Sequence, residues 1–271
     1  WDWKNTSDKE RKPAAGTNTV TAAFTPDEKY HGGYGAFEAE VSVAIQKAKV
    51  PVPTIADLIY NGAGQTASVP VSDYYKVKEN PSNTNAGTYT VKLELTASAN
   101  YEWENSSSEK VTTISYQILP AEITVDTSNA STEPIQYGQK LTAGSKDQTA
   151  TVNGVQNVKT ELTANGKVRG YSATFKNASG EDTSVNGTWA WITTTDGKVQ
   201  IKSDDGKETM VSQPLAAGTY QVKAQFIPNN SDGNLKSAEA YIPVTVQKAT
   251  PYTGNVTLTS EQYQTETIKN A

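Results

Sequence analysis

The chain has 271 residues and contains no cysteine and a single histidine, His31. Without cysteine, neither a disulfide framework nor a thiolate metal site can form. One imidazole excludes metal sites that need two or more histidines, and it offers little for acid–base or nucleophilic catalysis. His31 lies in the glycine-rich stretch Tyr30-His31-Gly32-Gly33-Tyr34-Gly35, so we interpret it as a loop residue. We predict that the chain is not an enzyme and uses no cofactor.

Long apolar runs and stretches of one charge are also missing. No uninterrupted apolar run approaches the roughly 20 residues needed to cross a bilayer, so we expect no membrane insertion in this segment. The 24 basic and 29 acidic residues are interspersed and give a net charge of −5, which leaves no basic stripe for phosphates. Nucleic acid is therefore excluded as a partner. The first residues, Trp1-Asp2-Trp3-Lys4, do not form a signal peptide, and we expect a segment of a longer protein.

The composition favours strands joined by turns. Hydrophobic residues make up 35% of the chain, tyrosine occurs 14 times, and Gly, Asn, Ser and Asp separate short apolar runs. Residues with β-branched and aromatic side chains fit strands, whereas Gly, Asn and Asp fit turns. We predict an all-β protein with little helix.

An internal repeat is marked by the triplet Ala-Gly-Thr, at Ala15-Gly16-Thr17, Ala86-Gly87-Thr88 and Ala217-Gly218-Thr219. Apolar and polar residues alternate after each triplet, which predicts a strand with one buried face. The predicted inward residues are Val20, Ala22 and Phe24 in the first copy, Tyr89, Val91, Leu93 and Leu95 in the second, and Tyr220, Val222, Ala224 and Phe226 in the third. A second alternating strand follows in each copy and ends at a junction, at Lys47-Ala48, Pro120-Ala121 and Lys248-Ala249.

These junctions predict the domain boundaries. Residues 1–49 correspond to the C-terminal half of a domain, because Trp1-Asp2-Trp3 aligns with Trp189-Ala190-Trp191. Residues 50–121 form a compact domain with a turn at Tyr60-Asn61-Gly62. Residues 122–249 form a longer one, in which 199–202 and 208–211 are the arms of an inserted hairpin. Residues 250–271 are predicted to begin a further domain.

Two aromatic residues are candidates for ligand binding, Trp103 and Tyr101, which lie beside a polar turn in Tyr101-Glu102-Trp103-Glu104-Asn105. Exposed aromatic rings can stack on sugars, but packing in or at the rim of the core is the favoured interpretation for Trp103. Acidic turn residues such as Asp204, Asp205 and Asp232 could offer oxygen ligands to Ca²⁺. Their spacing does not match an EF-hand loop, and turn chemistry explains them without an ion, so we predict no metal site.

Several motifs can be compared with those of known proteins. Those of residues 122–249 are Tyr137-Gly138-Gln139-Lys140-Leu141, Gly187-Thr188-Trp189-Ala190-Trp191, Ala217-Gly218-Thr219-Tyr220, and Val244-Thr245-Val246-Gln247-Lys248-Ala249. Those of residues 50–121 are Ile59-Tyr60-Asn61-Gly62, Asn85-Ala86-Gly87-Thr88-Tyr89 and Asn100-Tyr101-Glu102-Trp103. Together they resemble the Ig-like tandem repeats of bacterial surface proteins, including the MBG and bacterial Ig-like domains. The resemblance implies tandem immunoglobulin-like β-sandwiches outside the cell, at the cell surface or in the cell wall.

Three functions are compatible with this expectation. The favoured one is a non-enzymatic stalk or spacer module of a bacterial surface or secreted multidomain protein, whose partners are neighbouring repeats of the same chain. The second is an adhesive module that binds host or cell-wall glycans, mucin or surface proteins; the inserted hairpin of 122–249 motivates it, because loops often carry binding residues. The third is an accessory module of a secreted polysaccharide-degrading enzyme.

Overall fold

The computed structural model describes residues 2–3, 13–30, 32–152, 154–165, 167–229 and 232–249. Within these ranges the backbone forms strands, turns and the short 3-10 helix η1 (Glu28–Tyr30), with no α-helix. The predicted all-β class is therefore confirmed. The chain divides into unit 1, Trp1–Ala121 with Asp232–Asn234, and unit 2, Glu122–Ser231 with Leu235–Ala271. The predicted domain 250–271 lies outside the described residues, and the division of unit 1 at residue 49 stays a prediction.

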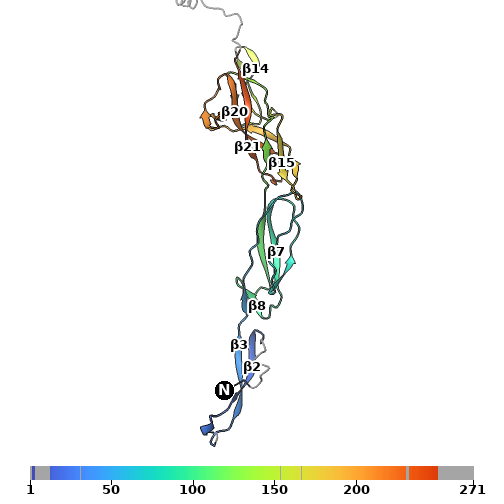
Figure 1. The fold of residues 1–271 in the computed structure, drawn as a ribbon, viewed down its shortest axis with the longest axis vertical. Helices are drawn as coiled ribbons and strands as arrows, with labels where there is room; N and C mark the ends of the chain where they lie inside the picture. Colours follow the sequence, from blue (N-terminus) through green and yellow to red (C-terminus); the bar gives the residue numbers. More distant parts are fainter. Residues whose placement is uncertain are drawn as a thin grey trace, which may run out of the picture. The chain divides into compact units, whose positions relative to one another are not determined.

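The three Ala-Gly-Thr triplets hold equivalent positions in three pairs of strands. The glycine of each triplet begins a long strand: β2 (Gly16–Phe24), β7 (Gly87–Leu95) and β20 (Gly218–Pro228). Each pairs antiparallel with the second strand of its copy: β3 (Phe37–Ile45), β9 (Val111–Leu119) and β21 (Ala238–Gln247). The register is the same three times, because the triplet glycine lies opposite Ile45, Ile118 and Val246 respectively. Figure 1 shows β20 beside β21 in unit 2.

A side-chain hydrogen bond closes the turn into each of these strands. The triplet glycines have positive φ, for example 119° at Gly16, a conformation that residues with a Cβ rarely adopt. Two residues later, the hydroxyls of Tyr89 and Tyr220 donate to the carbonyl oxygen four residues upstream, over 2.8 Å and 3.0 Å. At the same position of the first copy, Nδ2 of Asn18 donates to the carbonyl of Ala14 over 2.8 Å. A side-chain hydrogen bond to the same backbone position thus recurs in all three copies, with asparagine in place of tyrosine in the first.

The strands in the described part of unit 1 form three sheets. The largest has the order β5-β9-β7-β6, with β5 (Leu58–Ile59) parallel to β9 and β6 (Tyr75–Glu79) antiparallel to β7. The smallest consists of β4 (Ala48–Val50), which runs parallel to β8 (Tyr101–Trp103). The third has the order β1-β2-β3, where β1 (Asp2–Trp3) places Trp3 opposite Ala22. The predicted turn after Ile59 is present, with φ of 81° at Gly62.

Unit 2 contains a larger sheet with the order β11-β21-β20-β18-β19. Its β11 (Ile135–Gln136) is parallel to β21, as β5 is to β9 in unit 1. Its β17 (Gly187–Trp191) also pairs with β20 and places Trp191 opposite Ala224, which matches the register of Trp3 and Ala22. The other strands in the described part of unit 2 form two three-stranded sheets. One contains β10 (Thr124–Asp126), β15 (Ser172–Lys176) and β16 (Asp182–Ser184), and the other contains β12 (Lys140–Leu141), β14 (Val155–Leu162) and β13 (Gln148–Val152).

A hairpin is present at the predicted residues, and its origin as an insertion stays a prediction. Its arms are β18 (Val199–Lys202) and β19 (Glu208–Val211), which pair antiparallel along their whole length. Gly206 in the connecting turn has φ of 83°, the positive value that this turn requires. Because β18 also pairs with β20, this hairpin extends the main sheet of unit 2 instead of forming a separate loop.

Each unit has its own hydrophobic core, built from the inward faces predicted by alternation. Val222, Ala224 and Phe226 of β20 are fully buried, as are Val91 and Leu93 of β7. The ring of Phe226 lies 5.4 Å from that of Trp189 and 5.6 Å from that of Tyr171. In β2, Ala22 is buried, whereas Val20 and Phe24 are only half-buried. The same face is thus covered to different extents in the three copies.

Within unit 1, asparagines Asn100 and Asn234 accept hydrogen bonds at junctions. Oδ1 of Asn100 accepts from the amide of Ala15 (3.0 Å), and its backbone carbonyl accepts from the amide of Ala48 (2.9 Å). Asn234, which belongs to unit 1 by its contacts, repeats the arrangement. Its Oδ1 accepts from the amide of Ala86 (2.6 Å), and its carbonyl accepts from the amide of Ala121 (2.9 Å). In both cases one donor precedes a triplet glycine and the other is a junction alanine.

Phe226 and Phe24 provide a matched test of the core, since they hold the same position in their repeats. We expect Phe226→Ala to lower the free energy of unfolding of unit 2 by about 3–5 kcal/mol, because it removes a fully buried ring. The equivalent Phe24→Ala should cost much less, since its ring is half-buried. Denaturant unfolding of the full chain, followed by NMR signals of each unit, measures both. Equal losses for the two variants would contradict the assigned burial.

Candidate functional site

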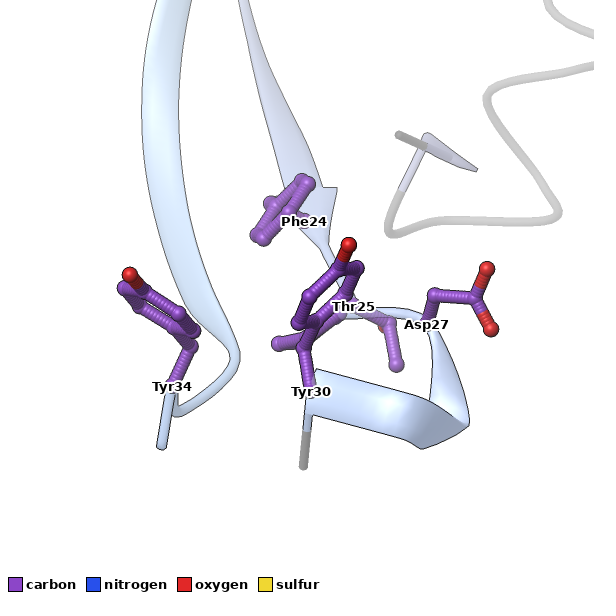
Figure 2. Close-up of a pocket in the computed structure, with 6 residues that line it drawn as sticks. Phe24, Thr25, Asp27, Tyr30 and Tyr34 are labelled. Carbon is purple, nitrogen blue, oxygen red and sulfur yellow. The ribbon is translucent and has the colours of Figure 1, made fainter. Parts of the chain in front are cut away.

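A group of exposed aromatic residues surrounds the connection between β2 and β3. The pocket there has a volume of about 620 Å³ and is lined by Phe24, Thr25, Pro26, Asp27, Tyr30 and Tyr34. Phe24 ends β2, and Tyr30 ends η1. Figure 2 shows the rings of Tyr30 and Tyr34 pointing the same way from the connection, toward the level of Phe24.

The connection is held by its own backbone. The amide of Tyr30 donates to the carbonyl of Asp27 (2.8 Å), and the amides of Gly33 and Tyr34 both donate to the carbonyl of Tyr30 (3.0 Å each). These bonds place the two tyrosines one turn apart, with ring centroids 6.5 Å apart and an interplanar angle of 77°. The aromatic rings are therefore held by short-range hydrogen bonds of the loop itself.

The pocket combines aromatic faces with charge at its rim. Tyr30 is 50% exposed and Tyr34 is 70% exposed, so both rings are accessible to a ligand. The ammonium group of Lys29 lies 4.7 Å from the centroid of the Tyr30 ring, a cation–π distance. Asp27 contributes an exposed carboxylate. Aromatic faces next to hydrogen-bonding groups can bind a ligand that has both apolar C–H faces and hydroxyls.

Sequence reasoning missed this pocket. It considered the stretch around His31 only as a glycine-rich loop, and His31 itself lies outside the described residues. The available signal was the density of aromatic residues, since Phe24, Tyr30, Tyr34 and Phe37 fall within one short connection and its flanking strand ends. Strand pairing brings the first and last of them together, with Phe24 opposite Phe37 and ring centroids 5.4 Å apart.

Burial contradicts the ligand-binding alternative for Trp103 and confirms the favoured interpretation, packing in the core. The side chain is fully buried in the core of unit 1, its ring lies 5.7 Å from that of Tyr75, and its Nε1 donates to the carbonyl of Lys110 over 3.2 Å. The reason is the parallel pairing of β8 with β4, which places Trp103 opposite the buried Val50. A ring enclosed in this way cannot stack on a ligand, and core packing is its role.

Tyr101, the second predicted binding residue, is half-buried and remains a candidate. Its ring meets that of Tyr74 edge to face with centroids 5.2 Å apart, and Tyr74 is 48% exposed. Tyr101 also borders a polar depression of about 130 Å³ that includes Lys47, Glu102 and Lys110. This site is smaller and more charged than the aromatic pocket, and its binding role stays a prediction.

The described residues contain no group of three or more His, Cys, Asp or Glu side chains placed to hold a metal ion. No helix in the described part of the chain is long and apolar enough to cross a membrane. In the turn that contains Asp205, Oδ1 of this residue accepts hydrogen bonds from the Ser203 hydroxyl and from the amide of Lys207. These interactions explain the acidic residues of this turn as turn chemistry.

Asp147 of unit 2 has a strongly lowered pKa, and its carboxylate stabilises the folded state. Burial of its side chain opposes ionisation, but the ammonium group of Lys167 (2.8 Å), the amide of Thr163 (2.8 Å) and the ammonium group of Lys159 (3.2 Å) outweigh this effect. Together they hold the pKa of Asp147 well below its usual range. A carboxylate that is ionised at all ordinary pH values and already paired cannot act as a proton donor, so we assign it to the stability of the β13–β14 region.

This assignment predicts a pH dependence. Because the pKa of Asp147 is lower in the folded state than in the unfolded state, its contribution to stability is complete at neutral pH and decreases as the pH falls below about 4. We expect Asp147→Asn to destabilise unit 2 by about 1–2 kcal/mol at pH 7, and to flatten the acid limb of its stability profile. Urea unfolding from pH 2 to pH 7 measures this, with Asp204→Asn in an exposed turn as the control. Parallel profiles for the variant and the unaltered chain would contradict the prediction.

Comparison with known proteins adds little to this description. No family model matches the sequence, and no curated protein matches it. Among solved structures, the chain is similar to SGBP-B of the Bacteroides ovatus mixed-linkage glucan utilization locus, in complex with a mixed-linkage heptasaccharide. The two are 12% identical, the alignment covers 77% of this chain and 70% of that chain, and the TM-score is 0.15. At this TM-score the likeness carries no argument about fold or ligand.

Proposed function

We propose that this chain is a non-enzymatic spacer built of tandem Ig-like domains, which belongs to a surface or secreted multidomain protein outside the cell. The observation that carries the proposal is the hydrogen-bonded junction in unit 1. Asn100 accepts from Ala15 and Ala48, and Nζ of Lys47 donates to the carbonyl of Ser98 over 2.6 Å. A spacer needs such joints, because a free linker would let successive repeats bend and would shorten their reach.

The strand pattern supports the Ig-like part of the proposal. In residues 50–121 and 122–249, a short early strand runs parallel to the last strand, and the last strand pairs with the strand that begins at the triplet glycine. Near the start of that strand, Tyr89 and Tyr220 bond back to the backbone four residues upstream. Ig sandwiches use a tyrosine in this manner, as a tyrosine corner.

The junction can be tested by measuring whether the repeats of unit 1 move together. We expect amides of 16–45 and of 87–119 to share one alignment tensor in NMR residual dipolar couplings of the full chain. The double variant Asn100→Ala/Lys47→Ala should separate the two tensors, because it removes two side-chain hydrogen bonds of the junction. Lys198→Ala, at a surface ion pair of unit 2, is the matched control. Two independent tensors in the unaltered chain would refute a fixed junction.

A second function, glycan binding, is supported by the aromatic pocket. Its rings are exposed on a loop, and faces of sugar rings present C–H groups that pack on aromatic surfaces. A competing explanation is that the pocket borders a core face. Phe24 holds the position of Phe226, whose ring packs against those of Tyr171 and Trp189 in the core of unit 2.

Binding measurements separate the two explanations. If the pocket binds glycans, Tyr30→Ala and Tyr34→Ala should each weaken binding of a glycan selected on an array by about tenfold, since each removes one stacking surface. Tyr137→Ala, which removes a tyrosine of similar exposure in unit 2, should leave the affinity unchanged. A full chain that binds no glycan or mucin, or an equal loss in all three variants, would exclude the adhesive function of this pocket.

A further inference from the structure

The third copy of the repeat contains the same pair of alanines that the asparagines bind in the other two copies. The first alanine of each pair directly precedes the triplet glycine; in the third copy it is Ala217. The second lies three residues after the residue that pairs with that glycine; in the third copy it is Ala249, three residues after Val246. Because the β20–β21 register equals that of β2–β3 and β7–β9, the two amides of the third copy occupy the same places on the strand ends as those of the other pairs.

The two occupied copies and the third differ in their hydrogen bonds. Ala15 and Ala48 donate to Asn100, and Ala86 and Ala121 donate to Asn234. No acceptor for the amides of Ala217 and Ala249 is found among the described residues, and both alanines are exposed. Ala15 and Ala86, which correspond to Ala217 in the other two copies, are half-buried.

We propose that the amides of Ala217 and Ala249 form a docking site for the asparagine of a further repeat of the same kind. The inference rests on the tandem-repeat organisation proposed above, but not on the spacer role. Both asparagines that fill the equivalent sites lie after the strand that begins at a triplet glycine, Asn100 after β7 and Asn234 after β20. The partner is therefore the corresponding loop of another repeat.

The chemistry of the site defines what it accepts. Two amide donors converge on one residue, which must offer a side-chain oxygen to the alanine before the glycine and a backbone oxygen to the junction alanine. Asparagine supplies a neutral, short acceptor, and its amide nitrogen remains free to donate, as Nδ2 of Asn234 does to Oδ1 of Asn85 (3.1 Å). At the third copy, the residue that corresponds to Asn85 is Ala216, so this additional bond is missing there.

The occupied sites are tested first, in the full chain, by residue-specific amide hydrogen exchange. Asn100→Ala should accelerate exchange at Ala15, and Asn234→Ala should accelerate exchange at Ala86, each by about tenfold, because each loses the side-chain acceptor. Exchange at Ala48 and Ala121 should change less, since their acceptor is a backbone carbonyl. Unchanged exchange at Ala15 and Ala86 would refute the bonding pattern itself.

The open site is tested by adding a repeat. In the unaltered chain we expect Ala217 and Ala249 to exchange at least about tenfold faster than Ala15 and Ala48. Two fusions, in which a second copy of 50–121 or of 122–249 follows Ala249, should slow both amides. Changing the asparagine of the added copy to alanine should release Ala217 and leave Ala249 protected. Slow exchange of the core amides of Val91 or Val222 in the added copy shows that it is folded.

Three results would overturn the proposal. The first is protection of Ala217 and Ala249 in the unaltered chain equal to that of Ala15 and Ala48. The second is fast exchange at both positions in a fusion whose added copy is folded, and the third is protection of Ala217 that persists when the added asparagine is changed to alanine. None of these results bears on the shared alignment of the repeats of unit 1. The docking site and the spacer function therefore fail independently.

Discussion

The pairing of a glycine with an apolar residue of the last strand is the constraint on which the repeats depend. Gly16, Gly87 and Gly218 enter their strands with positive φ and lie opposite Ile45, Ile118 and Val246. Because side chains alternate along a strand, this one register decides which residues face the core. It also places the alanine before the glycine near the end of the last strand, so the same pairing that fixes the core creates the pair of amide donors at the junction.

Much of this architecture could be predicted from the sequence, because it depends on local alternation. The inward face of β20 and the arms β18 and β19 of the inserted hairpin follow from patterns within a few residues of each other. Three occurrences of one pattern also constrain the register, since a register proposed for one pair of strands must also fit the other two. The boundary between Ala121 and Glu122 follows the same signal.

The candidate site could not be predicted in this way, since it depends on contacts between distant segments. Trp103 precedes a polar turn in the sequence, but a parallel strand more than fifty residues upstream covers it, and alternation carries no information about that partner. The aromatic pocket combines Phe24 of a strand end with Tyr30 and Tyr34 of a loop, and their convergence depends on loop hydrogen bonds. The asparagines of the junctions have no motif of their own, and only the bonds they accept distinguish them from other loop asparagines.

The parallel pairing of an early strand with the last strand has a mechanical consequence. β5 runs parallel to β9, and β11 runs parallel to β21, with Tyr60 and Tyr137 each adding a backbone bond beyond the short early strand. Tension on the chain pulls an early strand toward the N-terminus and a last strand toward the C-terminus. Since the two strands run in the same direction, this tension slides them past each other and loads all the bonds between them at the same time. Strands paired in this direction resist stretching by shear, because their hydrogen bonds do not break one after another.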